Sequence, residues 1–418
     1  MFSCTSTTNL FQFIKSPCHA AAFGYSAPRV DAAGTRPGIK ARDTQAGLQS
    51  LITGRIRVCK ISPFLIIGIA AGLWAAPVAA QVPGSDSFAR THIVIYASTL
   101  VSGFAGAIAK HLPLSATAGD AVPQVTPMLA DPAIKAFCAG VGPNYPDVVA
   151  SPRRMAKREF ELCDQNGVID IVELSLGFDA LVAVVKKGNP VFDLTPRMLY
   201  YATAAQIPKE DDFVPNPIKR WKEIDPKLPD LEIRVIASEN GTAINYSFKE
   251  FFLESGCRGL RQFKEYYSAE DRVKQCTTLR EDGLFQGIKA PIAVNFKDPL
   301  RNAPAGTVAI IPHTVYRRNM SWLDVLPVSG QTPSDEAIRG DDYDAVFPVR
   351  IYVKRSHMES KYGGKNVVAG LYEFIREAMS EEAIGNGGYL EMEGLVVDDL
   401  EDRKTDREKA LRLERFKR

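Results

Sequence analysis

The hydrophobic pattern along the chain alternates between short apolar stretches and segments with helical spacing. Residues 91–100 (THIVIYASTL) alternate apolar and polar side chains and end in small polar residues, and residues 101–112 repeat apolar side chains at helical intervals. The same order returns at 231–238 (LEIRVIAS), followed by a small polar turn at 239–242 and a predicted helix over 246–254. Strands that alternate with helices predict an α/β fold with largely parallel strands.

Other segments extend this pattern. Residues 169–190 are apolar enough to predict two buried strands with a kink between them. A helix is predicted over 197–205, strands over 306–312 and 349–355, and a helix over 367–379. Residues 398–418 are dense in charge of both signs and predict a solvated, charged helical tail.

The turn after the first strand has two interpretations. A strand, a Ser-Thr turn and a helix N-terminus together form a place where an anion can bind, because the first N–H groups of a helix have no partner within it. The same residues also fit an ordinary helix N-cap. This segment alone does not favour one interpretation over the other.

A secretory signal peptide is predicted over residues 55–80. The segment begins with basic residues, continues with an apolar run and ends in small residues, with a cleavage site after Ala80. An uncleaved anchor helix is the alternative, although the apolar run is short for a membrane span. Residues 1–54 show no hydrophobic periodicity, which indicates an unstructured extension or a start codon assigned too far upstream.

The cysteines agree with export to the periplasm. Cys138, Cys163, Cys257 and Cys276 form an even set after the predicted cleavage site, as expected for an oxidising compartment. Of the three ways to pair them, we favour Cys138 with Cys163 and Cys257 with Cys276, because each pair closes a short loop and stabilises the fold by about 3 kcal/mol. A zinc site is the alternative, but the chain has no CxxC pair.

Charge and motif content narrow the class of protein. With 51 basic and 49 acidic residues the net charge is +2, which does not indicate a nucleic-acid partner. The sequence lacks GxxxxGK[ST], HExxH, GxSxG and complete GxGxxG motifs, and its five histidines are scattered. We therefore predict that the protein is not an enzyme and uses no cofactor and no metal.

Six stretches carry a resemblance to a known family. They are FCAGVGPNYPD (137–147), RRMAKREFELCDQNGV (153–168), VPNPIKRWKEIDPKLPD (214–230), LREDG (279–283), FPVRIYVK (347–354) and SEEAIGNGGYL (380–390). With them the chain resembles the periplasmic phosphate-binding proteins (PstS type) of bacterial phosphate ABC importers, in the form typical of α-proteobacteria. The resemblance covers about residues 93–397, and all four cysteines after the cleavage site match family positions.

The resemblance implies the type II periplasmic-binding-protein fold, in which two α/β lobes are joined by two crossover strands. One lobe would contain residues 93–174 and 322–395, and the other residues 179–312. The function implied is that of a periplasmic monomer that binds inorganic phosphate or a related oxyanion and delivers it to an inner-membrane ABC permease.

The resemblance also implies a set of ligand-binding residues, carried over position by position. These are Ser98, Thr99, Leu100, Ser151, Arg153, Asn240, Gly241 and Thr242. Asp179 is expected either to accept a hydrogen bond from a protonated oxyanion or to act as a structural cap.

Four loops depart from the family pattern. At 96–99 (YAST) the glycine and the first serine of the family's first loop are absent, and at 151–154 (SPRR) the arginines are kept while the serine is moved or lost. At 128–133 (MLADPA) a glycine-rich loop is replaced by residues without glycine or hydroxyl groups, and Asp131 adds a carboxylate. At 239–243 (ENGTA) the family's terminal arginine is absent and Glu239 is present. Because a carboxylate that faces the cleft repels a doubly charged anion, a paralogue that binds a different ligand or none is the alternative function.

Overall fold

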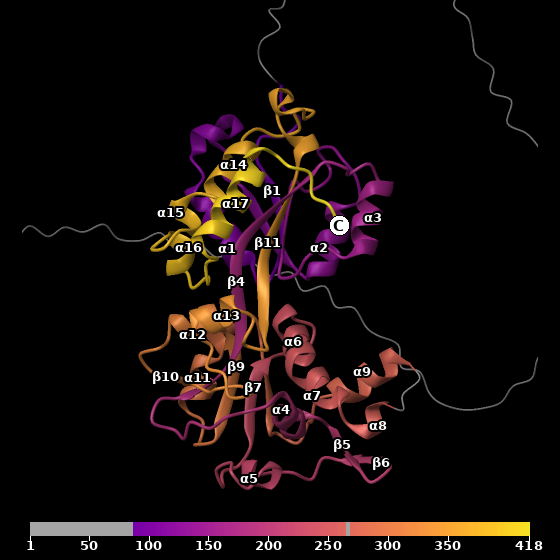
Figure 1. Ribbon diagram of the computed structural model, residues 1–418, viewed down its shortest axis with the longest axis vertical. Helices are drawn as coiled ribbons and strands as arrows, with labels where there is room; N and C mark the ends of the chain where they lie inside the picture. The colour runs from indigo at the N-terminus through magenta and orange to yellow at the C-terminus, as the bar shows by residue number, and fades with distance from the viewer. Residues whose placement is uncertain (1–86, 265–267) are drawn as a thin grey trace, which may run out of the picture. The chain divides into compact units, whose positions relative to one another are not determined.

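The computed structural model describes residues 87–264 and 268–418, all within the unit Gln81–Arg418 (Figure 1). The predicted signal peptide at 55–80 and the extension at 1–54 lie outside the described residues and stay predictions. None of the helices in the described part of the chain is long and apolar enough to cross a membrane.

The first half of the main sheet follows the order β2-β1-β3-β11. Its strands are β1 (Val94–Ser98), β2 (Gln124–Met128), β3 (Val148–Ser151) and β11 (Val346–Lys354). The first three strands are parallel to one another, and β11 is antiparallel to β3. The helices α1 (Ser102–His111), α2 (Ala130–Phe137) and α3 (Lys157–Gln165) follow β1, β2 and β3 in turn.

The second half follows the order β9-β7-β8. It consists of β7 (Arg234–Ser238), β8 (Phe285–Ile288) and β9 (Thr307–Pro312), which are parallel. The short strand β10 (Leu323–Val325) pairs with the last residues of β4 (Ile171–Lys186). The lobe boundary predicted at residue 322 therefore falls just before a strand of the second half, and β11 is the strand that returns the chain to the first.

One continuous strand, β4, runs through both halves of the sheet, and it corrects the prediction of two strands with a kink over 169–190. β4 pairs antiparallel with β11 along its first part and with β9 along its last part. Figure 1 shows β4 and β11 side by side where the chain passes between the halves. The register shifts opposite Gly177, whose φ is 137°, so a glycine absorbs the irregularity and the strand continues.

Short helices and turns connect these strands. The remaining helices are α4 (Pro196–Thr203), α5 (Trp221–Ile224), α6 (Ala243–Phe248), α7 (Ser255–Arg258), α8 (Arg261–Lys264), α9 (Ala269–Thr277), α10 (Ile292–Asn295), α11 (Lys297–Arg301), α12 (His313–Arg317), α13 (Asp335–Arg339), α14 (Leu371–Ala378), α15 (Glu381–Ile384), α16 (Tyr389–Met392) and α17 (Leu400–Leu411). A π-helical segment (Lys249–Glu254) links α6 to α7. The strands β5 (Gln206–Lys209) and β6 (Asp212–Pro215) form a separate hairpin.

Capping interactions decide where the predicted helices begin. The helix expected over 246–254 starts earlier, at Ala243, because the Thr242 hydroxyl accepts a hydrogen bond from the backbone N–H of Asn245 at 3.2 Å. The helix expected over 197–205 is α4, which Thr195 caps in the same way. The helix expected over 367–379 begins only at Leu371, after Gly370 in the left-handed conformation.

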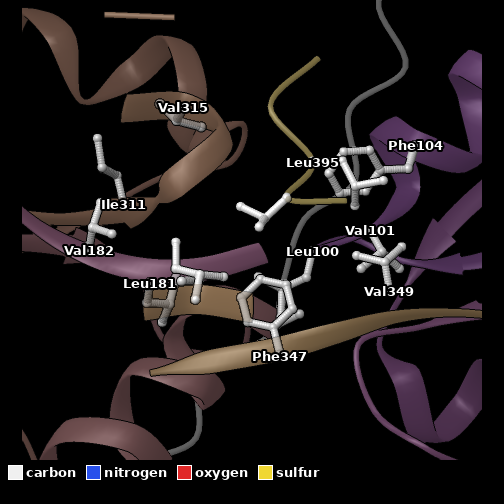
Figure 2. Close-up of a cluster of buried hydrophobic side chains, with 14 of the residues drawn as sticks. Leu100, Val101, Phe104, Leu181, Val182, Ile311, Val315, Phe347, Val349 and Leu395 are labelled. Atoms are coloured by element: carbon white, nitrogen blue, oxygen red, sulfur yellow. The ribbon is translucent and has the colours of Figure 1, made fainter. Parts of the chain in front are cut away.

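A continuous group of buried side chains spans both halves of the sheet. Figure 2 shows Val182 and Ile311 from the second half, Val101 and Val349 from the first, and Phe347 between them. The charged tail forms α17, as predicted, but it is not wholly solvated. Phe416 is buried after this helix, and its backbone N–H donates to the carbonyl of Ile171 at 2.7 Å.

Both favoured disulfides are confirmed. Cys138 is bonded to Cys163, and Cys257 is bonded to Cys276. The zinc alternative for these residues is wrong, because their sulfur atoms are bonded to one another. The prediction of largely parallel strands holds within each half of the sheet, whereas β4 and β11 are antiparallel to their neighbours.

Candidate functional site

The carboxyl ends of strands from both halves of the sheet meet at one cavity of about 690 Å³. Residues at the ends of five strands line it, namely Thr99 after β1, Met128 at the end of β2, Ser238 at the end of β7, Ala290 after β8 and Pro312 at the end of β9. In open α/β sheets this edge is where ligands bind, because the loops that follow the strands converge there. The topology therefore identifies this cavity as the candidate site.

Several helices present their N-termini to this cavity, and two of them, α1 and α2, are at least eight residues long. Ser102 and Gly103 are the first residues of α1 and line the cavity, as does Leu129, which precedes α2. The first N–H groups of a helix have no partner within it and carry a partial positive charge. This arrangement favours an anionic group in the cavity.

Hydroxyl groups add hydrogen-bonding capacity to the cavity wall. Thr99, Ser102, Ser238, Thr242 and Thr314 line it. The Thr242 hydroxyl donates toward Ser238 Oγ at 2.8 Å and toward the Glu239 carbonyl at 2.9 Å. Gly241 precedes Thr242 with a φ of 88°, a left-handed conformation that favours glycine and lets the turn present Thr242 to the cavity.

One ion pair lies among the residues that line the cavity. Arg318, just after α12, and Glu393, just after α16, are its only charged side chains within the described part of the chain. The Arg318 guanidinium forms an ion pair with the Glu393 carboxylate and also donates to the Glu393 carbonyl at 2.8 Å. About half of each side chain is exposed, so water screens the pair.

Asp179 is a buried carboxyl group directly behind this wall. Its Oδ1 accepts hydrogen bonds from the backbone N–H of Ala180 at 2.8 Å and of Thr314 at 3.2 Å. Its Oδ2 has no partner within the described residues, and burial raises the pKa of Asp179 to about 7. The contacts to Ala180 and Thr314 fit the structural cap that the sequence allowed.

The structure brings half of the predicted ligand-binding residues to the cavity. Thr99, Leu100, Gly241 and Thr242 line it. Ser98 lies one residue before Thr99, is fully buried, and has a hydroxyl with no partner among the described residues.

Ser151, Arg153 and Asn240 are not among the residues that line the cavity. Arg153 donates to Glu159 at 2.7 and 2.8 Å and to Asp131 at 2.6 Å, and its hydrogen bonds to Glu159 raise the pKa of the guanidinium. The Ser151 hydroxyl donates to the Arg153 carbonyl at 2.8 Å. Asn240 Oδ1 accepts a hydrogen bond from Lys249 at 2.9 Å. A contact between any of these three residues and the ligand stays a prediction.

The two carboxylates that would repel an anion are also absent from the cavity lining. Asp131 is exposed and paired with Arg153, and Glu239 is not among the lining residues. The departures from the family pattern at these positions therefore do not add negative charge to the wall.

Several lining residues were not found by sequence reasoning. Thr314 follows β9, and Ile292 follows β8. The strand over 306–312 is predicted from the sequence, so the residues just after it, which include Thr314, are candidates that its position could have indicated. Arg318 and Glu393 offer no such signal, because one follows a short helix and the other comes from a distant segment.

Comparison with known proteins supports a family assignment. Residues 82–382 match the PBP superfamily domain. Protein SphX of Synechococcus elongatus is 32% identical over 226 residues, which are 52% of this chain and 56% of that protein. The match thus spans about half the length of this curated relative.

Solved structures share the fold. A possible phosphate binding protein from Planctomyces limnophilus has a TM-score of 0.53 at 17% identity, covering 79% of this chain and 100% of that one. PfluDING, a high-affinity periplasmic phosphate-binding protein bound with phosphate, has a TM-score of 0.50 at 12% identity, covering 76% and 93%. The two-part α/β fold is thus that of periplasmic binding proteins. Because the family model matches residues 82–382, most of the chain, the protein belongs to the family that carries the PBP superfamily domain.

Proposed function

We propose that this protein is the periplasmic solute-binding component of an ABC importer, that it binds inorganic phosphate or a related oxyanion, and that it delivers this solute to an inner-membrane permease. The observation that carries the proposal is the convergence of five strand ends and of the N-termini of α1 and α2 on one cavity. Such a wall offers hydrogen-bond donors to an anion without an excess of charge.

The phosphate-binding proteins that share the fold support this choice of ligand. We place the oxyanion against Thr99, Leu100, Gly241 and Thr242, which are predicted contacts that line the cavity. Export by the signal peptide, the monomeric state, the partner permease and the absence of enzymatic activity are parts of the same proposal. A paralogue with another ligand is the second candidate, because most of the lining side chains are apolar.

Calorimetric titration of the full-length protein with phosphate, with sulfate as the control anion, tests the proposal. We expect phosphate to bind, and Thr99→Val to weaken this binding by up to about tenfold through loss of one hydroxyl. Thr332→Val, which removes an exposed hydroxyl outside the cavity lining, is the matched control. Absence of heat with millimolar phosphate, in a protein that unfolds cooperatively, would remove phosphate as the ligand.

A further inference from the structure

The cavity is large for an inorganic oxyanion. Its volume of about 690 Å³ lies in the range of about 300–1,000 Å³ that is typical of pockets for organic ligands. A phosphate ion is only a few times larger than a water molecule, which takes about 30 Å³ in the liquid. Inorganic phosphate alone would leave most of the cavity to water.

The wall of the cavity is mainly apolar. Apolar side chains from five different helices or their caps line it, and Leu100, Phe104, Ile292 and Val315 are at most 8% exposed. Figure 2 shows Leu100, Phe104 and Val315 as part of the buried hydrophobic cluster. Displacing water from such a surface with an apolar group lowers the free energy of the system. The wall therefore favours a ligand with an apolar part.

The charged end of the cavity is Arg318. It is the cationic residue of the lining within the described residues, and its partner Glu393 comes from the C-terminal segment. Because both side chains are half exposed, their ion pair is weak and an anionic ligand can replace Glu393 at little cost. A guanidinium can donate two parallel hydrogen bonds to the oxygen atoms of a phosphonate or phosphate group.

We infer that the cavity binds an organic oxyanion with an apolar substituent, namely a monosubstituted phosphonate or phosphate ester. Its anionic group is the oxyanion placed above against Thr99, Leu100, Gly241 and Thr242, and it takes Arg318 from Glu393 as a further partner. Its substituent packs against Leu129, Ile292 and Val315. This inference rests on the proposed function and deepens it, since it names the class of solute that the same cavity accepts.

Titration of the full-length protein with inorganic phosphate and with methyl-, butyl- and hexylphosphonate tests the ligand class. We expect the affinity to rise by up to about fourfold for each methylene group that is buried. Binding of phosphate without any rise along the series would overturn this inference and leave the proposed function standing. If none of the four compounds binds, both fail.

Variants at the charged end test the role of Arg318. We expect Arg318→Gln to weaken the binding of every phosphonate by about tenfold or more, because it removes a charged hydrogen bond. Glu393→Gln should instead tighten binding, because the guanidinium no longer has a competing carboxylate. Unchanged affinity in Arg318→Gln, or weaker binding in Glu393→Gln, would contradict the assignment.

A variant of the apolar wall separates the two ends of the ligand. Leu129 occupies the N-cap position of α2, but its side chain makes no capping hydrogen bond. Leu129→Thr therefore removes an apolar group from the wall and supplies a hydroxyl that can cap the helix. We expect it to reduce the dependence of affinity on chain length, measured as the ratio of hexylphosphonate to methylphosphonate affinity within the same variant, because this ratio cancels any change at the anionic group. Leu114→Thr, at an exposed leucine outside the cavity lining, is the matched control and should keep the full dependence on chain length.

Discussion

Asp179 is a fully buried carboxyl group whose titration affects stability. Burial raises its pKa to about 7 in the folded protein, whereas an unfolded aspartate titrates near about 3.9. The folded state therefore binds more protons than the unfolded state between these values. It follows that this group makes the protein less stable as the pH rises from about 4 to about 7.

Asp179→Asn should remove this dependence while keeping an acceptor for the N–H groups of Ala180 and Thr314. We expect the variant to gain stability relative to the original protein as the pH rises, by up to about 1.4 kcal/mol per pH unit within that window. Urea unfolding at pH 4, 5.5 and 7 measures the difference. A difference that stays constant over this range would show that Asp179 does not titrate there.

Arg153 has a clear structural role at the residue scale. Its guanidinium bridges Glu159, which also accepts the backbone N–H of Ala156 at the start of α3, and Asp131 at the start of α2. We expect Arg153→Ala to lower the free energy of unfolding by about 1 kcal/mol, because Glu159 loses its partner. Arg154→Ala, which removes a more exposed ion pair with Glu173, is the control.

The same two variants examine the predicted contact between Arg153 and the ligand. Titration with phosphate would support this contact if Arg153→Ala lost affinity and Arg154→Ala did not. Equal affinities would leave Arg153 with its structural role alone.

At the scale of elements, the stretches that carry the family resemblance mainly hold loops and strands together. In the stretch 137–147, the buried Asp147 accepts hydrogen bonds from the backbone N–H of Val94 at 2.7 Å and from Arg90 and interacts with His357 at 2.7 Å. In the stretch 279–283, Arg280 donates to the carbonyl of Ile218 at 2.9 Å. Buried polar groups in these two stretches therefore hold backbone segments of the fold in place.

The disulfide between Cys138 and Cys163 ties α2 to α3. The two cysteines are 25 residues apart, so the chain-entropy estimate for their bond is about 3.5 kcal/mol. We expect the double variant Cys138→Ala, Cys163→Ala to lower the free energy of unfolding by about this amount, as measured by urea unfolding under oxidising conditions. The original protein in reducing agent is a second comparison, and equal stability of the variant and the oxidised protein would contradict the estimate.

At the scale of the whole described unit, the crossover strand and the C-terminal segment act together. The backbone of Phe178 in β4 exchanges hydrogen bonds with Val396 at 2.8 and 2.9 Å. This pairing brings the C-terminal segment, with Glu393, to the side of the cavity where Arg318 lies. The strand that joins the two halves of the sheet is thus also the strand that positions one wall of the site.

Gly177 is essential to this junction. Its φ of 137° favours glycine, and a Cβ atom at this position would overlap the carbonyl of Val396. We therefore expect Gly177→Ala to destabilise the protein by at least about 2 kcal/mol and to weaken ligand binding, because the C-terminal segment must move. Gly106→Ala, in α1 with nothing near the added methyl group, should be at least as stable as the original protein. Thermal unfolding measures the stability of the two variants, and titration with phosphate measures their ligand binding.

Much of the fold could be predicted because its signals are local. The strand over 91–100 and its following helix depend on the spacing of neighbouring side chains, and the disulfide pairing depends on short loops. Strands β2 and β3 were not predicted, because β2 (QVTPM) contains a proline and few apolar residues and β3 is only four residues long. Such short segments become strands only when a neighbouring strand pairs with them.

The sequence by itself determined the strand, turn and helix units, the disulfide pairs and the α/β class, since hydrophobic period, loop length and turn residues act over a few neighbours. Only the tertiary structure decided which of the candidate residues share a cavity. Thr99 and Thr242 meet there because the two halves of the sheet direct their strand ends toward each other, whereas Arg153 is engaged by Glu159 and Asp131. Arg318 and Glu393 join the wall through pairing between segments that are distant in the chain, and no local pattern encodes such pairing.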